Sequence, residues 1–167
     1  MVINHIKPPK TICTITDEGH RVFLAGSIEM GKAEDWQQKI TDTLHKDKYR
    51  PFIIYNPRRD DWDSSWKQGM EEPQFYQQVN WEMNALDKCD TIFMYFDKNT
   101  KSPISLLELG LYASSKKMVV CCPDGFWRKG NVVAVCEKYG IPMYNDFDEA
   151  TESLIKKVKT SGKQLLT

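Results

Sequence analysis

The chain has 167 residues, of which 41% are hydrophobic and 28% are charged, and its 23 basic residues balance its 23 acidic ones. This composition is typical of a soluble globular protein with a single domain. The zero formal net charge argues against a general nucleic-acid binder or membrane-surface binder. No apolar run approaches the roughly 20 residues that a membrane-spanning helix needs.

Residues 1–20 are predicted to form an extended N-terminal arm, followed by one domain over residues 21–167. In this domain, short apolar segments alternate with segments of helical periodicity. Strands are expected at 21–26, 52–55, 91–96, 118–122 and 141–144. Helices are expected at 33–46, 73–88, from Pro103 onward, 131–139 and 146–159. This alternation predicts a doubly wound α/β fold with a mainly parallel sheet of five strands. Ligands of such sheets bind at the carboxyl ends of the strands.

The five cysteines are odd in number, and none belongs to a CxxC pair. Cys121 and Cys122 end an apolar segment and are expected to be small core residues in a reducing, cytoplasmic compartment. The three histidines are scattered outside the apolar segments. We therefore expect no metal site and no cofactor.

Three carboxylates stand in apolar contexts. Glu108 lies between leucines in the second turn of the helix that begins at Pro103, Glu82 precedes Met83, which is expected to face the core, and Asp90 opens an apolar strand. Buried carboxylates need a partner or a chemical role, so they indicate acid, base or nucleophile chemistry of the kind used on glycosidic bonds. The alternatives are solvent-exposed glutamates on helix edges and a structural cap by Asp90.

Two loops carry further candidates for ligand binding. After the first strand, Gly26 allows close approach of a ligand, with Ser27 and Ile28 beside it, although neither a GxGxxG nor a Walker pattern is present. The alternative there is an ordinary strand-to-helix turn. After the second strand, a base or a phosphate could be held by Asn56, Arg58, Arg59 and Trp62. The alternative there is a self-neutralising charged loop. Aromatic candidates for stacking on a base are Trp62, Trp66 and Trp81.

Together these pieces resemble the nucleoside 2-deoxyribosyltransferase family, which includes nucleotide N-glycosidases. The resemblance covers roughly residues 21–145 and depends on the order and spacing of several short motifs. Its parts are Val22 to Ile28, Glu82 eight residues before Asp90, Cys89 to Met94, Leu107 to Gly110, and Pro123 followed by Asn131.

The resemblance implies a flavodoxin-like fold and cleavage of an N-glycosidic bond. Glu108 would be the nucleophile, Glu82 would contact the base and assist proton transfer, and Asp90 would support the site. Asn131 would reach the sugar of a neighbouring subunit, which implies a homodimer or larger oligomer with shared active sites. The expected partners are a nucleoside or nucleotide and a free base.

Three positions depart from the family pattern. Phe23 replaces a tyrosine near the nucleophile, Ser102 replaces an aspartate that binds the sugar, and Glu29 replaces an arginine of the nucleotide-hydrolysing relatives. Three hypotheses follow: a deoxyribosyltransferase, a hydrolase of nucleosides or 5′-monophosphates, and a non-catalytic nucleotide-binding domain. If the substrate carries a 5′-phosphate, the cations that could bind it in place of the arginine replaced by Glu29 are Lys32, Arg58 and Arg59.

Overall fold

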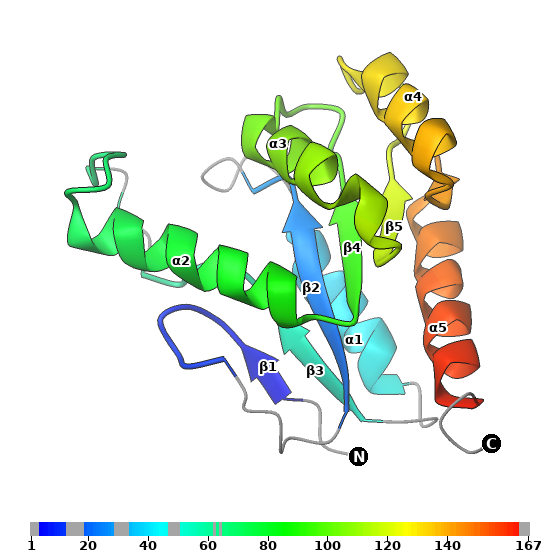
Figure 1. Cartoon of the computed structure of the whole chain (residues 1–167), viewed down its shortest axis with the longest axis horizontal. Helices are drawn as coiled ribbons and strands as arrows, with labels where there is room; N and C mark the ends of the chain where they lie inside the picture. The colour runs from blue at the N-terminus through cyan, green and yellow to red at the C-terminus, as the bar shows by residue number, and fades with distance from the viewer. Residues whose placement is uncertain are drawn as a thin grey trace.

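A parallel sheet forms the centre of the protein (Figure 1). The computed structural model describes residues 4–12, 19–28, 34–46, 51–61, 63 and 65–163, without the side chains of 161–163. Six strands lie in the order β1-β3-β2-β4-β5-β6, and every neighbouring pair is parallel. The strands are β1 (Asn4–Ile6), β2 (His20–Gly26), β3 (Phe52–Tyr55), β4 (Thr91–Tyr95), β5 (Met118–Cys121) and β6 (Met143–Tyr144).

The order β3-β2-β4-β5-β6 is that of a flavodoxin-like, doubly wound sheet. Its central strands are apolar on both faces because helices cover both sides, as their near-continuous hydrophobic sequences indicate. Val22 of β2 pairs with Ile54 of β3 on one side and with Thr91 of β4 on the other. The predicted fold class is therefore confirmed.

The sheet has six strands where five were expected, because the N-terminal segment contributes β1. Ile6 is buried in the core, and Ile12 packs against the same core cluster. Lys10 accepts a hydrogen bond from Trp81 Nε1 at 2.8 Å through its backbone oxygen. The described part of the segment, residues 4–12, thus belongs to the sheet domain and is not a separate arm.

Five α-helices cover the two faces of the sheet (Figure 1). On one face lie α2 (Pro73–Lys88), α3 (Pro103–Tyr112) and α4 (Lys129–Tyr139), and on the other lie α1 (Trp36–Lys46) and α5 (Phe147–Lys163). A short 3₁₀ turn at Ala113–Ser115 follows α3. No helix within the described ranges is both long and apolar enough to cross a membrane.

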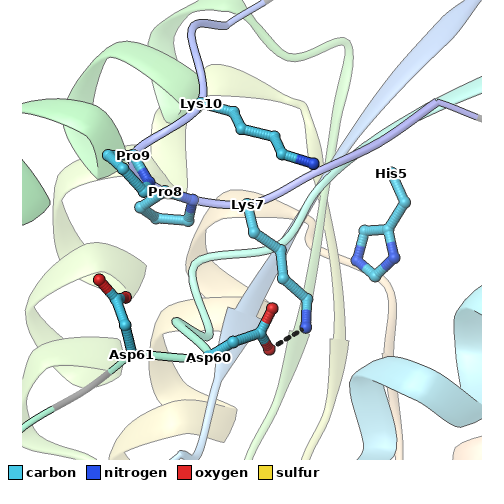
Figure 2. A pocket seen from close by; sticks show the side chains of 7 residues that line it. All are labelled: His5, Lys7, Pro8, Pro9, Lys10, Asp60 and Asp61. Atoms are coloured by element: carbon cyan, nitrogen blue, oxygen red, sulfur yellow. Dashed lines mark hydrogen bonds and ion pairs between the residues drawn. The ribbon is translucent and has the colours of Figure 1, made fainter.

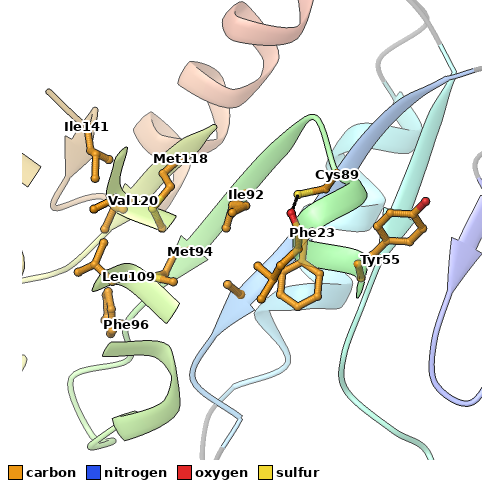
Figure 3. Close-up of a cluster of buried hydrophobic side chains, with 14 of the residues drawn as sticks. Phe23, Tyr55, Cys89, Ile92, Met94, Phe96, Leu109, Met118, Val120 and Ile141 are labelled. Carbon is orange, nitrogen blue, oxygen red and sulfur yellow. Dashed lines mark hydrogen bonds between the residues drawn. The ribbon is translucent and has the colours of Figure 1, made fainter. Parts of the chain in front are cut away.

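The core under α2, α3 and α4 is continuous with the sheet (Figure 3). Phe23, Ile92, Met94 and Val120 point from the strands toward these helices, where Leu109 of α3 joins them. This packing fixes both helices that carry the predicted catalytic glutamates.

The apolar face of α2 differs from the expected one. Gln78, Trp81, Ala85 and Leu86 are buried, whereas Met83, expected to face the core, is 49% exposed. The large indole of Trp81 packs between the rings of the strands and determines which side of the helix faces the sheet. Glu82 therefore still lies at the border of the buried side of α2, but at the border opposite to the expected one.

Candidate active site

The candidate site lies at the carboxyl end of β2, where the strand order of the doubly wound sheet reverses. Gly26 ends this strand with φ of 139°, a backbone conformation that disfavours any side chain. A Cβ atom at this position would lie only 2.1 Å from the backbone oxygen of Tyr95. Glycine is therefore required for the close approach of β2 to β4, and Ser27 follows directly at the edge of the sheet.

Ser27, Thr100 and Ser102 form a buried cluster of hydroxyl groups beside Gly26. Ser27 Oγ lies 2.5 Å from Ser102 Oγ and 2.8 Å from Thr100 Oγ1, and the latter two oxygens are 2.8 Å apart. The backbone N–H of Asp97 donates to Ser27 Oγ at 2.8 Å, while Thr100 donates to the Asp97 carbonyl at 2.9 Å. The structure thus brings the predicted residues Ser27 and Ser102 together, with their hydroxyl groups engaged with each other.

Ser102 also begins helix α3 in the left-handed conformation, with φ of 47°. Its hydroxyl makes no cap to the helix, because it is used in the hydroxyl cluster. Pro103 then occupies the first helical turn, which its fixed φ and missing N–H suit. A strained residue at a helix start is a feature of functional sites, and here it sets the direction of the helix that carries Glu108.

Glu108 and Glu82 lie close enough for their charges to interact. Burial, and after it the charge of Glu82, raise the pKa of Glu108 to about 8. Burial likewise raises the pKa of Glu82 to about 7, against the lowering effect of a hydrogen bond from Gln78. Two carboxylates that share a shielded site cannot both ionise readily, so their titrations are coupled.

Gln78 connects Glu82 to the loop after β3. Its Nε2 donates to Glu82 Oε1 at 2.7 Å and to the Pro57 backbone oxygen at 2.9 Å. The side chain is buried, since the residue is only 7% exposed. Gln78 was not identified from the sequence, although a polar residue four positions before Glu82 places both on one side of the helix.

Asp90 lies at the opposite edge of the sheet, before β4 begins, and the structure does not bring it together with the two glutamates. Its Oδ2 accepts the backbone N–H of Arg21 at 2.8 Å and lies 3.9 Å from the Arg21 guanidinium. The backbone N–H of Asp90 in turn donates to the Arg21 oxygen. This geometry is that of a cap joining β2 to β4, the alternative considered for this residue.

The loop after β3 is held together by its own charges. Arg59 makes a two-pronged contact with Asp61 at 2.8 and 3.0 Å and donates to Gln77 Oε1 at 3.1 Å. Its guanidinium stacks over Trp66 at 5.0 Å, and its side chain is only 4% exposed. Arg59, predicted to bind substrate, is therefore committed to its own loop, as in the self-neutralising alternative.

Asn56 and Arg58 face α1 and the N-terminal segment. Asn56 is buried, accepts the backbone N–H of Arg58 at 3.0 Å, and its Nδ2 lies 3.1 Å from His5 Nε2. Arg58 Nη1 reaches Gln37 Oε1 at 3.4 Å and Asp35 at 3.8 Å. Both side chains thus have protein partners in this structure.

The remaining predicted aromatic contacts have structural roles. Phe23 is fully buried and packs against Trp81, with ring centroids 6.5 Å apart, so it lies in the core and not on an open wall of the site. Trp81 belongs to α2 and is also buried, so neither ring offers a face to a base. Trp66 stacks with Arg59, and Trp62 lies outside the described residues, as do Glu29 and Lys32.

Asn131 is exposed in the first turn of α4, and Ile28 is half-buried just after Ser27. Within the described residues Asn131 makes no side-chain hydrogen bond to either glutamate, and its expected role in a neighbouring subunit stays a prediction. Thr100, the third member of the hydroxyl cluster, was not predicted. Its partners come from segments far apart in the sequence, so no local signal marks it.

A depression of about 410 Å³ lies beside the N-terminal segment (Figure 2). Lys7 forms an ion pair with Asp60 across it, at 2.6 Å. The other lining residues are His5, Pro8, Pro9, Lys10 and Asp61. Burial and the nearby Lys7 charge lower the pKa of His5, so its ring is neutral at physiological pH. Neither glutamate lines this depression.

Comparisons with known proteins place this geometry in context. A profile of the family described as "nucleoside 2-deoxyribosyltransferase like" matches residues 19–126, which carry both glutamates and the hydroxyl cluster. A search of curated proteins finds no match. A solved structure of a conserved protein from Enterococcus faecalis aligns with a TM-score of 0.58 at 11% identity, covering 86% of this chain and 99% of that chain. At this identity the likeness shows the fold alone.

Proposed function

Because the chain belongs to the nucleoside 2-deoxyribosyltransferase-like family, we propose that it cleaves the N-glycosidic bond of a (2′-deoxy)nucleoside and transfers the sugar to another base. The feature that supports this proposal is the pair of half-buried carboxyl groups of Glu82 on α2 and Glu108 on α3, because burial raises the pKa of both. Their raised pKa values mean that the pair carries a single proton near pH 7 to 8. One group is then available as a nucleophile and the other as an acid.

In the first step, a Glu108 carboxylate oxygen attacks the anomeric carbon of the sugar. The bond from this carbon to the base nitrogen breaks, its electron pair remains on the base, and Glu82 protonates the base. In the free protein the pair shares this proton, because burial raises the pKa of both groups. Positive charge developing on the sugar favours ionised Glu108 and moves the proton to Glu82.

In the second step, a nitrogen of the acceptor base attacks the same carbon of the ester between the sugar and Glu108. The ester bond breaks, Glu108 leaves as a carboxylate, and Glu82 takes the proton that the acceptor nitrogen loses. The pair returns to its initial singly protonated state. Glu82 thus acts as acid and then as base, for which a pKa of about 7 is well suited.

The hydroxyl cluster favours a second candidate, an N-glycosidase in which water replaces the acceptor base. By the resemblance, Ser102 stands where some members of the family have an aspartate for the sugar, and its hydroxyl is engaged with Ser27 and Thr100. A sugar held less firmly at this position favours release over transfer. The first chemical step is the same in both reactions.

Chromatography of reaction mixtures tests the proposal. The protein is incubated with deoxynucleosides, ribonucleosides and their 5′-monophosphates, each with and without a second free base. A new nucleoside that contains the second base identifies a transferase, whereas free base and free sugar identify an N-glycosidase. If none of these substrates is turned over, the enzymatic proposal is wrong and the binding-domain hypothesis takes its place.

The assembly proposed for this enzyme is a homo-oligomer that buries the outer face of α3. Ile104, Leu107 and Leu111 lie at helical spacing on this face and are 60 to 67% exposed. An apolar stripe of this kind marks an interaction surface, and Glu108 follows Leu107 directly. We expect Leu107→Glu to shift the protein to smaller species in analytical ultracentrifugation, whereas Lys116→Glu, on an exposed turn, should not. An unchanged oligomer in the leucine variant would remove α3 from the interface.

A further inference from the structure

Gln78 is buried on α2 with its amide in a single orientation. Its Nε2 points at two oxygens, the Pro57 backbone oxygen at 2.9 Å and Glu82 Oε1 at 2.7 Å. The Pro57 oxygen only accepts hydrogen bonds, so the group that faces it must be the N–H side of the amide. Reversing the amide would place Gln78 Oε1 against this oxygen at the cost of a buried hydrogen bond.

This orientation determines which oxygen of Glu82 carries a proton. The second N–H of Gln78 is directed at Glu82 Oε1, which must accept it. In a carboxylic acid the carbonyl oxygen is the better acceptor, so the bond to Gln78 favours Oε1 as the carbonyl and Oε2 as the hydroxyl oxygen. We propose that Gln78 is a positioning residue that confines the acidic proton of Glu82 to Oε2 and thereby sets the atom from which the substrate is protonated.

The inference rests on the proposed function only for its catalytic consequence, because the hydrogen bonds are present in the free protein. Gln78 Oε1 has no hydrogen-bond partner among the described residues, so the two N–H bonds are what hold this amide. One of them reaches the loop after β3 and the other reaches the acid. Gln78 therefore couples the position of this loop to the orientation of the Glu82 carboxyl group.

Within the described ranges, Gln78 is the one side chain that forms a hydrogen bond with Glu82, and the charged groups of the neighbouring elements form none with it. The N-terminal segment offers Lys10, whose backbone contacts the neighbouring Trp81, and the loop after β3 offers Arg59, which is bound to Asp61 and Gln77. Strand β2 contributes the uncharged ring of Phe23. Helix α3 contributes Glu108, whose pKa the charge of Glu82 raises.

Gln78→Met tests the inference, because methionine keeps the length of the side chain and removes both N–H donors. Gln77→Met is the matched control, since Gln77 also ties α2 to the same loop, through Arg59, without contacting Glu82. The first readout is the pH dependence of kcat/KM and kcat. We expect Gln78→Met to lower kcat about 10- to 100-fold, to leave KM within about threefold, and to move the acidic limb to higher pH. The control should leave the acidic limb in place.

A second readout does not require turnover. In carbon NMR titrations of the glutamate carboxyl groups, the midpoint of Glu82 should rise in Gln78→Met and stay unchanged in Gln77→Met. In the unmodified protein, the side-chain amide signals of Gln78 should titrate with this midpoint, and those of Gln77 should not. This last measurement remains decisive if the methionine variant does not fold.

The outcomes separate the two proposals. If the protein turns over no nucleoside but the Gln78 amide signals titrate together with Glu82, the proposed function is wrong and the positioning role of Gln78 stands. Equal loss of kcat at every pH, with an unmoved Glu82 midpoint, would show that Gln78 only supports the fold. Gln78 amide signals that ignore the Glu82 titration would overturn the inference directly.

Discussion

The two edges of the central sheet use their carboxylates in opposite ways. At the amino edge, Asp90 accepts the Arg21 backbone N–H, is partly exposed and joins two strands. At the carboxyl edge, Glu82 and Glu108 are half-buried, burial raises the pKa of both, and the charge of Glu82 raises that of Glu108 as well. A carboxylate with a matched donor stabilises the fold, whereas a shielded like-charge pair costs stability. This contrast is expected where stability has been exchanged for chemistry.

The largest expected effect is a difference in catalytic activity between substitutions at the two edges of the sheet. Glu108→Gln removes the proposed nucleophile and should lower kcat/KM at least about a thousandfold, equivalent to about 4 kcal/mol of barrier, because an amide forms no glycosyl ester. Asp90→Ala should change kcat/KM less than about threefold. Steady-state kinetics on the best substrate measures both. If the two variants lose activity equally, the amino edge takes part in catalysis and the contrast is lost.

The two glutamates should also make the free energy of unfolding depend on pH in a definite direction. The raised pKa values keep protons on Glu82 and Glu108 in the folded protein up to about pH 7 and 8, whereas the unfolded chain releases them near the ordinary glutamate pKa of 4.5. The unfolded state therefore binds fewer protons in this window, and the free energy of unfolding falls as pH rises through it.

Glu108→Gln removes much of this fall. We expect the variant to match the unmodified protein at pH 4.5 and to exceed its free energy of unfolding by roughly 2 to 4 kcal/mol at pH 8.5, at about 1.4 kcal/mol per pKa unit. Urea titrations at both values of pH provide the measurement. Equal destabilisation at both pH values would mean that Glu108 is a structural residue.

The smallest effect concerns the amino edge. Asp90→Ala leaves the Arg21 backbone N–H without its acceptor and should lower the free energy of unfolding by about 1 kcal/mol. The ion pair to Arg21 adds little, because Asp90 is partly exposed. Asp90→Asn retains an acceptor oxygen and should recover part of the loss in the same urea titration. A larger cost at high pH than at pH 6 would contradict the assigned role.

Much of the fold follows from the sequence, because its signals are local. The strand at 52–55 is a short, continuous apolar run, and the helix at 73–88 begins with a proline, so both have the predicted bounds. The three-residue strand β1 has no such signal: its residues are mostly polar, and only pairing with β3 makes it a strand. The face of α2 was misjudged because Met83 fits the periodicity as well as Trp81 does.

The site could be predicted only where single residues stand out from their neighbours. Glu108 between leucines and Glu82 in an apolar helix are visible as local anomalies. Gln78 and Thr100 are ordinary polar residues in the sequence, and their importance comes from partners that the fold brings to them. In the arginine loop the sequence left two interpretations open, and the structure adds that Arg59, one of the residues that suggested a phosphate site, pairs with Asp61.

The added strand also bears on the order in which the protein matures on the ribosome. Residues 4–6 are synthesised before their partner β3 and before the indole of Trp81. A three-residue strand has no stability until that partner exists, so this segment docks only after the later elements have formed. Until it docks, Trp81 on the helix of Glu82 lacks its carbonyl partner. We expect the helix that carries Glu82 to reach its final packing only when this segment docks.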